Sequence, residues 1–424
     1  MKKELELLRI KMKKIGVDAC LIPTSDFHGS EYVGDYFKCR EYISGFTGSA
    51  GTLVVTLDEA GLWTDGRYFL QAAKQLDGSG IILMKERQPG VPTIEEYLKI
   101  TLKKGQTLGF DGRCIMADYA DTLVAQLNAQ GAAVRTDVDL PGAVWESRPQ
   151  LSAEAAWPLP EEYAGESSQS KIERVRTFLM EKQSEYFLLT SLEDIAWLLN
   201  MRGNDVESTP VILSYLLLGQ QEIIWYVQDK CLSEKIKILL ELQGIRTAPY
   251  AQIYEDIKKL PEGTSVYYDK TATNTALISA LPEKVKKIEG VNPTLLFKAK
   301  KNPIEVENER KAHIKDGVAV TKFIYWLKKN VGKQKITEIS AAEKLEEFRK
   351  AQEHYIEPSF SPIIAYKEHG AIVHYSATKE SDVEIKPESF ILADTGGHYL
   401  EGTTDITRTI AVGTLTQEER EMYT

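Results

Sequence analysis

The sequence predicts an α/β fold with two related mixed-sheet α/β domains, followed by a third region of two helices and then strands. Three observations lead to this prediction. Helical and strand patterns alternate along the first two regions, the first pattern restarts partway along the chain, and two helical segments precede a β-rich stretch near the end. The three domains are expected at residues 1–160, 161–298 and 299–424.

The first domain opens with a helix, because Leu5, Leu8, Met12 and Ile15 recur at helical spacing. An apolar run then predicts a buried strand over residues 18–24. The same reasoning predicts, in order, a hairpin over 52–56 and 61–64, a helix from about 68, a strand over 81–84, a helix over 93–102, a strand over 107–110 and a helix over 117–130. These elements indicate a mixed sheet covered by helices.

The second domain repeats this order after a proline-rich linker over residues 141–168. LIPTS in the first domain matches FLLTS in the second at an offset of 166 residues, and the tryptophans of GLWTD and IIWYV match at 162. The elements expected here are helices over 171–182 and 195–199, a strand over 186–190, and a hairpin over 211–217 and 223–227. The nearly equal offsets predict an internal duplication.

The third region begins with a helix whose N-cap is expected at Asn302, with Pro303 in its first turn. Thr337 is the expected cap of a second helix. Strands are expected over 363–365, 371–374, 391–394 and 404–412. The final residues, TQEEREMYT, have the pattern of a helix that the chain end interrupts, so we expect the chain to be a fragment of a longer protein.

The composition excludes several classes of function. A net charge of −10 and a pI near 5.4 argue against nucleic acid as a partner, because phosphate binding requires a basic surface. The four cysteines lack CxxC or zinc-finger spacing and are expected to be reduced thiols of a cytoplasmic protein. The charged N-terminal segment is not a signal peptide, and no window is apolar enough to predict a membrane span.

Asp394 and Asp405 are the candidate metal ligands, eleven residues apart in ILADTGGHYLEGTTDITRTIAVG. Two strands joined by a glycine-containing turn would fold these carboxylates towards each other, which is costly unless a cation or a shared proton relieves the repulsion. Strand alternation sends Arg408 to the opposite face. The alternative is that one aspartate caps a turn while the other pairs with a remote Lys or Arg.

Several long motifs resemble a known family. They are YISGFTGSAGT and LWTDGRYFLQAAKQ in the first domain, DIAWLLNMRGNDVESTPV in the second, and AHIKDGVAV, TEISAAEKLEEFR, GAIVHY and DTGGHYLEGTTDITRT in the third. In this order they resemble the long, three-domain form of aminopeptidase P, a pita-bread metallopeptidase that releases the residue preceding proline. The resemblance implies two creatinase N-terminal-like domains followed by the first half of an α+β pita-bread catalytic domain.

The resemblance also implies site residues. Family members hold two divalent cations, usually manganese, with two aspartates, one histidine and two glutamates, and Asp394 and Asp405 match the two aspartates. His374 matches a catalytic histidine that contacts substrate, and Arg67 matches a substrate-side arginine. Without the resemblance, His374 is a strand histidine satisfied by the backbone, and Arg67 is equally a helix-start arginine paired with Asp65.

One departure from the family pattern matters most. The remaining histidine and two glutamates would lie beyond the chain end, nineteen residues after Asp405, so this chain is expected to bind Mn²⁺ weakly and to have little peptidase activity. The intact protein is expected to be a cytoplasmic homodimer that cleaves peptides with penultimate proline, without nucleic-acid or membrane partners. The alternatives are a non-catalytic pita-bread peptide-binding module, an X-Pro dipeptidase and a creatine-type amidinohydrolase.

Overall fold

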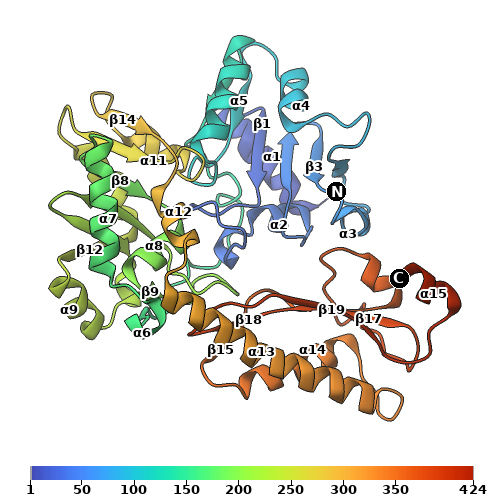
Figure 1. Ribbon diagram of the computed structural model, residues 1–424. Helices are drawn as coiled ribbons and strands as arrows, with labels where there is room; N and C mark the ends of the chain where they lie inside the picture. The colour runs from blue at the N-terminus through green and yellow to red at the C-terminus, as the bar shows by residue number, and fades with distance from the viewer. Residues whose placement is uncertain (1, 424) are drawn as a thin grey trace. The chain divides into compact units, whose positions relative to one another are not determined.

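A computed structural model describes residues 2–423 and divides the chain into two compact units (Figure 1). The first unit comprises Met1–Pro158 and Ser167–Lys300, and the second comprises Leu159–Glu166 and Lys301–Thr424. Both predicted α/β domains fall in the first unit, while residues 159–166 join the third region. The three predicted domain boundaries remain a prediction.

The first sheet has six strands in the order β4-β3-β2-β1-β5-β6. Its strands are β1 (Ala19–Pro23), β2 (Thr52–Thr56), β3 (Ala60–Thr64), β4 (Ile82–Lys85), β5 (Thr107–Gly109) and β6 (Ala133–Arg135). β2 runs antiparallel to both β1 and β3, and every other neighbouring pair is parallel. The predicted mixed sheet and hairpin are therefore confirmed, whereas the short strand β6 was not predicted.

Helices cover both faces of this sheet in the way that the apolar spacing predicts. They are α1 (Lys3–Ile15), α2 (Cys39–Ser44), α3 (Phe69–Gln75), α4 (Ile94–Thr101) and α5 (Ala117–Ala129). Leu5, Leu8 and Met12 of α1 are fully buried in one apolar cluster, and Leu123 and Leu127 of α5 are buried in another. The two clusters contain side chains from opposite faces of β1, Cys20 and Leu21, so both faces are packed.

The second sheet repeats the first strand for strand, in the order β12-β11-β10-β8-β13-β14. Its strands are β8 (Tyr186–Leu189), β10 (Ser214–Gly219), β11 (Ile223–Val227), β12 (Ile245–Pro249), β13 (Ser265–Tyr268) and β14 (Lys286–Glu289). The central strand β10 is again antiparallel to both neighbours, and the outer pairs are again parallel. The predicted internal duplication is confirmed, with Trp63 on β3 and Trp225 on β11 both buried.

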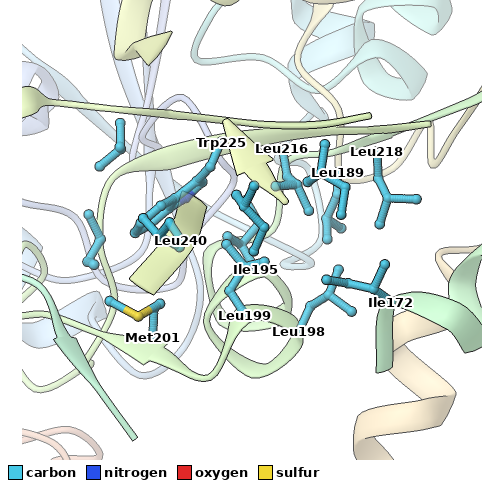
Figure 2. Packing of buried hydrophobic residues seen from close by; sticks show 14 of the residues in the cluster. Ile172, Leu189, Ile195, Leu198, Leu199, Met201, Leu216, Leu218, Trp225 and Leu240 are labelled. Carbon is cyan, nitrogen blue, oxygen red and sulfur yellow. The ribbon is translucent and has the colours of Figure 1, made fainter. Parts of the chain in front are cut away.

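The second sheet packs against α7 and α8 on one face (Figure 2). Helices of this part are α7 (Ser168–Glu181), α8 (Leu192–Leu199), α9 (Glu234–Leu242), α10 (Ile253–Asp256), α11 (Thr275–Ala280) and α12 (Pro293–Ala299). The short strands β7 (Trp157–Pro158) and β9 (Met201–Arg202) form a separate pair, and single 3₁₀ turns occupy Asp35–Phe37, Asp229–Cys231, Tyr250–Gln252 and Ile257–Lys259. Leu216 lies in register with Leu189 on one side and Trp225 on the other.

Replacing Leu216 with alanine is expected to destabilise the first unit by about 2–5 kcal/mol, because the side chain is fully buried in the apolar cluster on one face of the second sheet and its loss leaves a cavity. Urea unfolding followed by tryptophan fluorescence measures the change. Leu242→Ala on α9 is the matched control, since that leucine is 79% exposed and its loss should change stability by less than about 0.5 kcal/mol. Equal effects of the two substitutions would contradict this assignment of the core.

The second unit contains two long helices over one face of a three-stranded sheet. Its helices are α6 (Glu161–Ala164), α13 (Pro303–Asn330), α14 (Glu338–Lys350) and α15 (Gln417–Tyr423). Asn302 and Thr337 cap α13 and α14 as predicted, each within a capping box. Apolar side chains of both helices, including Phe323 and Leu345, pack on the sheet β16-β17-β19.

The strands of this unit form two small sheets. They are β15 (Tyr355–Pro358), β16 (Ile363–Tyr366), β17 (Phe390–Thr395), β18 (Gly397–Tyr399) and β19 (Ile406–Ala411). β17 lies between β16 and β19 and is antiparallel to both, while β18 pairs with β15 in a separate sheet. β17, which carries Asp394, and β19, which Asp405 directly precedes, are therefore not joined by one simple turn, because β18 intervenes. Among residues 2–423, no helix combines the length and apolar character that a bilayer crossing requires.

Candidate functional site

Asp394 and Asp405 lie on the same face of the three-stranded sheet. Asp394 of β17 is in register with Thr407 of β19, and Asp405 comes two residues before Thr407, just ahead of that strand. Since residues two apart on a strand share a face, the two carboxylates are diagonal neighbours, a relation that places Cβ atoms within about 8 Å. The Thr407 hydroxyl donates to Asp394 Oδ1 at 2.6 Å. Arg408 is in register with Ala393 and so belongs to the opposite face, as expected.

The electrostatics of this pair favour a cation. Partial burial and then the nearby charge of Asp394 raise the pKa of Asp405 above its ordinary value. Within residues 2–423, neither aspartate forms an ion pair with a Lys, Arg or His side chain, so the predicted alternative of a remote basic partner is not what the fold provides. Two carboxylates with no basic partner suit a hard divalent ion.

The described part of the chain supplies only a partial donor set. No group of three or more His, Cys, Asp and Glu side chains within it is arranged to hold a metal ion. Asp394 and Asp405 therefore fit two positions of a metal site and leave the others to be filled by water or by further ligands. Manganese, as an ion that accepts carboxylate oxygens, is compatible with this pair.

Gly396 lets the chain pass from β17 into β18 at this site. A Cβ at Gly396 would lie 2.1 Å from Ser359 Oγ and 2.1 Å from the Thr404 carbonyl oxygen. The Ser359 hydroxyl donates to that same carbonyl at 2.8 Å. Because backbone and hydroxyl approach so closely, only glycine fits here, and the segments before Asp405 and after Asp394 are held together.

His374 does not lie on a strand, so the predicted strand over residues 371–374 is wrong. The chain forms a 3₁₀ helix, η5 (Lys367–Ala371), and His374 follows in an exposed turn with φ of +57°. Gly370 of η5 lies against Leu392, which shares a sheet face with Asp394. The segment that carries His374 therefore starts on the aspartate face of the sheet.

A buried carboxylate that the sequence did not reveal anchors this segment. Glu338, fully buried at the start of α14, accepts hydrogen bonds from the Tyr366 amide at 2.7 Å and from the Tyr375 hydroxyl at 2.8 Å. His369 Nδ1 lies 2.9 Å from Glu338 Oε1, and its ring stacks on Tyr375. Burial and the Glu338 carboxylate raise the pKa of Tyr375 to about 12.

The Glu338 contacts fix the residues on both sides of His374. The sequence prediction gave His369 no role. Two signals pointed to one: His369 lies five residues before His374, and Glu338 lies in the motif TEISAAEKLEEFR. Two further histidines have defined places in the fold. His398 lies in β18, and His28 is buried, with its ring nitrogens 2.8 Å from the Thr190 carbonyl oxygen and 2.7 Å from the Tyr250 hydroxyl.

Arg67 precedes α3 in the first unit and forms a two-pronged pair with Asp65. Its Nε donates to Asp65 Oδ1 at 2.8 Å and its Nη2 to Oδ2 at 2.7 Å, and these bonds raise the pKa of Arg67. This is the pairing that the sequence allowed as an alternative to a substrate-side role. The substrate-side role remains a prediction.

Family models match nearly the whole chain. Residues 5–149 and 147–305 each match the creatinase/prolidase N-terminal domain, and residues 307–424 match metallopeptidase family M24. The duplicated sheets of the first unit thus correspond to two copies of one domain type, and the sheet that carries the aspartates belongs to the metallopeptidase region.

Individual proteins are similar over the full chain. Xaa-Pro aminopeptidase 1 of Dictyostelium discoideum is 36% identical over 100% of this chain and 69% of its own length. Aminopeptidase P2 of Arabidopsis thaliana is 35% identical over 97% of this chain and 62% of its own. The crystal structure of X-prolyl aminopeptidase from Caenorhabditis elegans, described as a cytosolic enzyme with a di-nuclear active site, superposes with a TM-score of 0.93 at 32% identity, over 98% of this chain and 70% of that one.

Proposed function

The chain belongs to the Xaa-Pro aminopeptidase family of metallopeptidases, and on that premise we propose that Asp394 and Asp405 provide two ligands of a dinuclear manganese centre. The reaction of this family is hydrolysis of the bond between an N-terminal residue and a following proline. Because proline makes this bond a tertiary amide with a fixed φ, general peptidases handle it poorly, which leaves the bond to a dedicated enzyme.

One observation carries the proposal: two carboxylates share a sheet face without a basic partner in the described residues, at the positions of the family's aspartate pair. Divalent ions bound there would lower the pKa of a nearby water and polarise the scissile carbonyl. The protein's own contribution is to place both carboxylates on one face of the sheet as diagonal neighbours. The Thr407 hydroxyl supports this by donating to Asp394.

His374 is proposed to donate a hydrogen bond to the substrate carbonyl as negative charge develops on its oxygen. Its exposure and the start of its segment on the aspartate face support this role. Arg67 is proposed to bind a peptide carbonyl or carboxylate, for which its planar fork is suited. In that role the Arg67 guanidinium would donate to the substrate either in addition to Asp65 or in place of it.

The protein is proposed to act in the cytoplasm as a homodimer on peptides with penultimate proline. The cytosolic enzyme from Caenorhabditis elegans supports the location, and the net charge of −10 agrees with peptide rather than nucleic-acid partners. Sedimentation velocity measures the assembly state directly.

His374→Gln is expected to lower kcat by about 10²–10³-fold with a smaller change in KM, because the lost hydrogen bond strengthens in the transition state. The assay follows release of the first residue from an Arg-Pro-Pro peptide by the full-length protein, with and without Mn²⁺. His313→Gln is the matched control, since that histidine lies on the surface of α13. An unaltered kcat in His374→Gln would contradict the assigned role, and indifference to proline at the second position would contradict the proposed function.

A further inference from the structure

The two threonines next to the candidate metal ligands point into the core of the second unit. Thr395 directly follows Asp394 and Thr404 directly precedes Asp405, and each threonine is only 1% exposed. Because successive side chains along an extended chain alternate between faces, burying the threonines turns both aspartates towards the other face. Whatever holds the threonines therefore also sets the direction of the aspartates.

A buried ion pair lies beneath these threonines. Asp316 of α13 is 0% exposed and Arg349 of α14 is 2% exposed. Arg349 Nε donates to Asp316 Oδ1 at 2.6 Å, and Nη2 donates to Oδ2 at 3.1 Å. The two charges thus face each other in the fork geometry that Arg and carboxylate favour.

Each member of the ion pair also bonds one of the threonines. Arg349 Nη2 donates to Thr395 Oγ1 at 3.0 Å, and the Thr404 hydroxyl donates to Asp316 Oδ2 at 2.7 Å. The Tyr399 hydroxyl adds a bond to Asp316 Oδ1 at 3.2 Å. The network therefore connects the residue after one aspartate with the residue before the other through a single Asp–Arg contact.

We propose that Asp316 and Arg349 are positioning residues that fix how the two ligand-bearing segments sit against each other and so keep Asp394 and Asp405 on one face. This inference rests on the proposed metal-binding role of the aspartates. Moving either segment by one residue would turn its aspartate into the core and its threonine outwards, which would break a bond to the ion pair. Groups that support metal ligands in this way commonly govern metal affinity.

The chemistry of the pair favours this role over simple helix packing. A buried ion pair stabilises a core no better than apolar side chains of similar size, because desolvation offsets the attraction. Specifying a register is the best-supported use of such a pair. Here the ion pair joins the two helices and also forms hydrogen bonds with Thr395 and Thr404. At these two positions, the register of the chain determines which side chains face outwards.

Hydrogen exchange tests the proposal without any metal. Thr395→Val and Thr404→Val keep the β-branched shape and remove only the hydroxyl. In each variant, amides of residues 390–411 are expected to exchange about tenfold faster than in the wild-type protein, while α13 and α14 keep wild-type rates.

Two matched controls define the alternatives. Thr321→Val on α13 makes the same chemical change at an exposed site outside the network, and should leave exchange unaltered throughout. Leu345→Ala on α14 removes buried apolar contacts and should raise exchange in helices and strands together. The proposal is overturned if the two network variants leave residues 390–411 unaltered, or if they reproduce the Leu345→Ala pattern.

Manganese binding provides the second readout. Electron paramagnetic resonance counts free Mn²⁺ during titration of the full-length protein, and both network variants are expected to bind about 10–100-fold more weakly than wild type, with Thr321→Val unaltered. Equal affinity in all variants would overturn the positioning role. If the wild-type protein takes up no Mn²⁺, the proposed metal centre fails, and the exchange experiment still decides whether the ion pair sets the register.

Discussion

Replacing Arg349 with methionine is expected to destabilise the second unit by about 3–5 kcal/mol. Methionine fills much of the arginine volume, so the cavity term is small. The cost arises because the Asp316 carboxylate, at 0% exposure, loses the only ionic partner that it has among residues 2–423. The hydroxyls of Thr404 and Tyr399 still donate to Asp316, but neutral donors compensate a buried carboxylate incompletely.

The change is measured by denaturant-dependent hydrogen exchange in α13 and α14, which isolates the second unit from the first. Arg310→Met on α13 is the matched control, since its side chain is 71% exposed and its pair with Glu307 is weak, so the expected effect is below about 0.5 kcal/mol.

The double variant Asp316→Leu/Arg349→Met tests the mechanism further. It removes both charges and should recover much of the stability that Arg349→Met loses, because no unpaired charge stays buried. A double variant as unstable as Arg349→Met would show that the arginine acts by packing rather than by charge.

Most of the fold could be predicted because the sequence patterns are local. The apolar spacing of Leu5, Leu8 and Met12 gave α1, and the caps at Asn302 and Thr337 gave the starts of α13 and α14. The duplicated order was also visible, since Trp63 and Trp225 occupy corresponding strands of sheets with the same strand order. Each of these features depends on residues close together in sequence or on repetition of a pattern.

The features that were missed depend on contacts between distant segments. GAIVHY has the apolar content of a strand, yet it forms a turn after η5, where Tyr375 and His369 both bond Glu338, more than thirty residues earlier. Strand β18 was missed because its partner β15 precedes it by about forty residues and neither is long. Tertiary hydrogen bonds decided both outcomes against the local pattern.

The site shows the same division. Asp394 and Asp405 could be chosen from residue type and spacing, and strand alternation correctly separated them from Arg408. The buried pair of Asp316 and Arg349 could not be predicted in this way. Asp316 lies 78 positions before Asp394, and nothing in the sequence of its helix marks it as buried. The motif AHIKDGVAV, which contains Asp316, resembles the family sequence but does not by itself indicate a role for this residue. In the structure, Asp316 accepts a hydrogen bond from the Thr404 hydroxyl next to Asp405.

Replacing Asp394 with asparagine is expected to lower kcat/KM of the full-length protein for an X-Pro peptide by about 10³-fold or more. The amide keeps the size of the side chain and can still accept the Thr407 hydrogen bond, but it lacks the charge that holds a divalent ion. The metal-free protein should be at least as stable as wild type, because the substitution removes the Asp394 charge, which adds to burial in raising the pKa of Asp405. Kinetics, Mn²⁺ titration and thermal unfolding together measure these three effects.

Glu421→Gln on α15 is the matched control, since it neutralises an exposed carboxylate of the same unit whose bond is to Gln417 on its own helix. Because no group of three or more His, Cys, Asp and Glu side chains within residues 2–423 is arranged to hold a metal ion, the 424-residue chain is expected to bind Mn²⁺ weakly even without substitution. Tight uptake of two ions by that chain would contradict this expectation. Wild-type activity in Asp394→Asn would contradict the proposed role of the carboxylate pair, because a neutral amide at this position leaves a single charge to attract the ions.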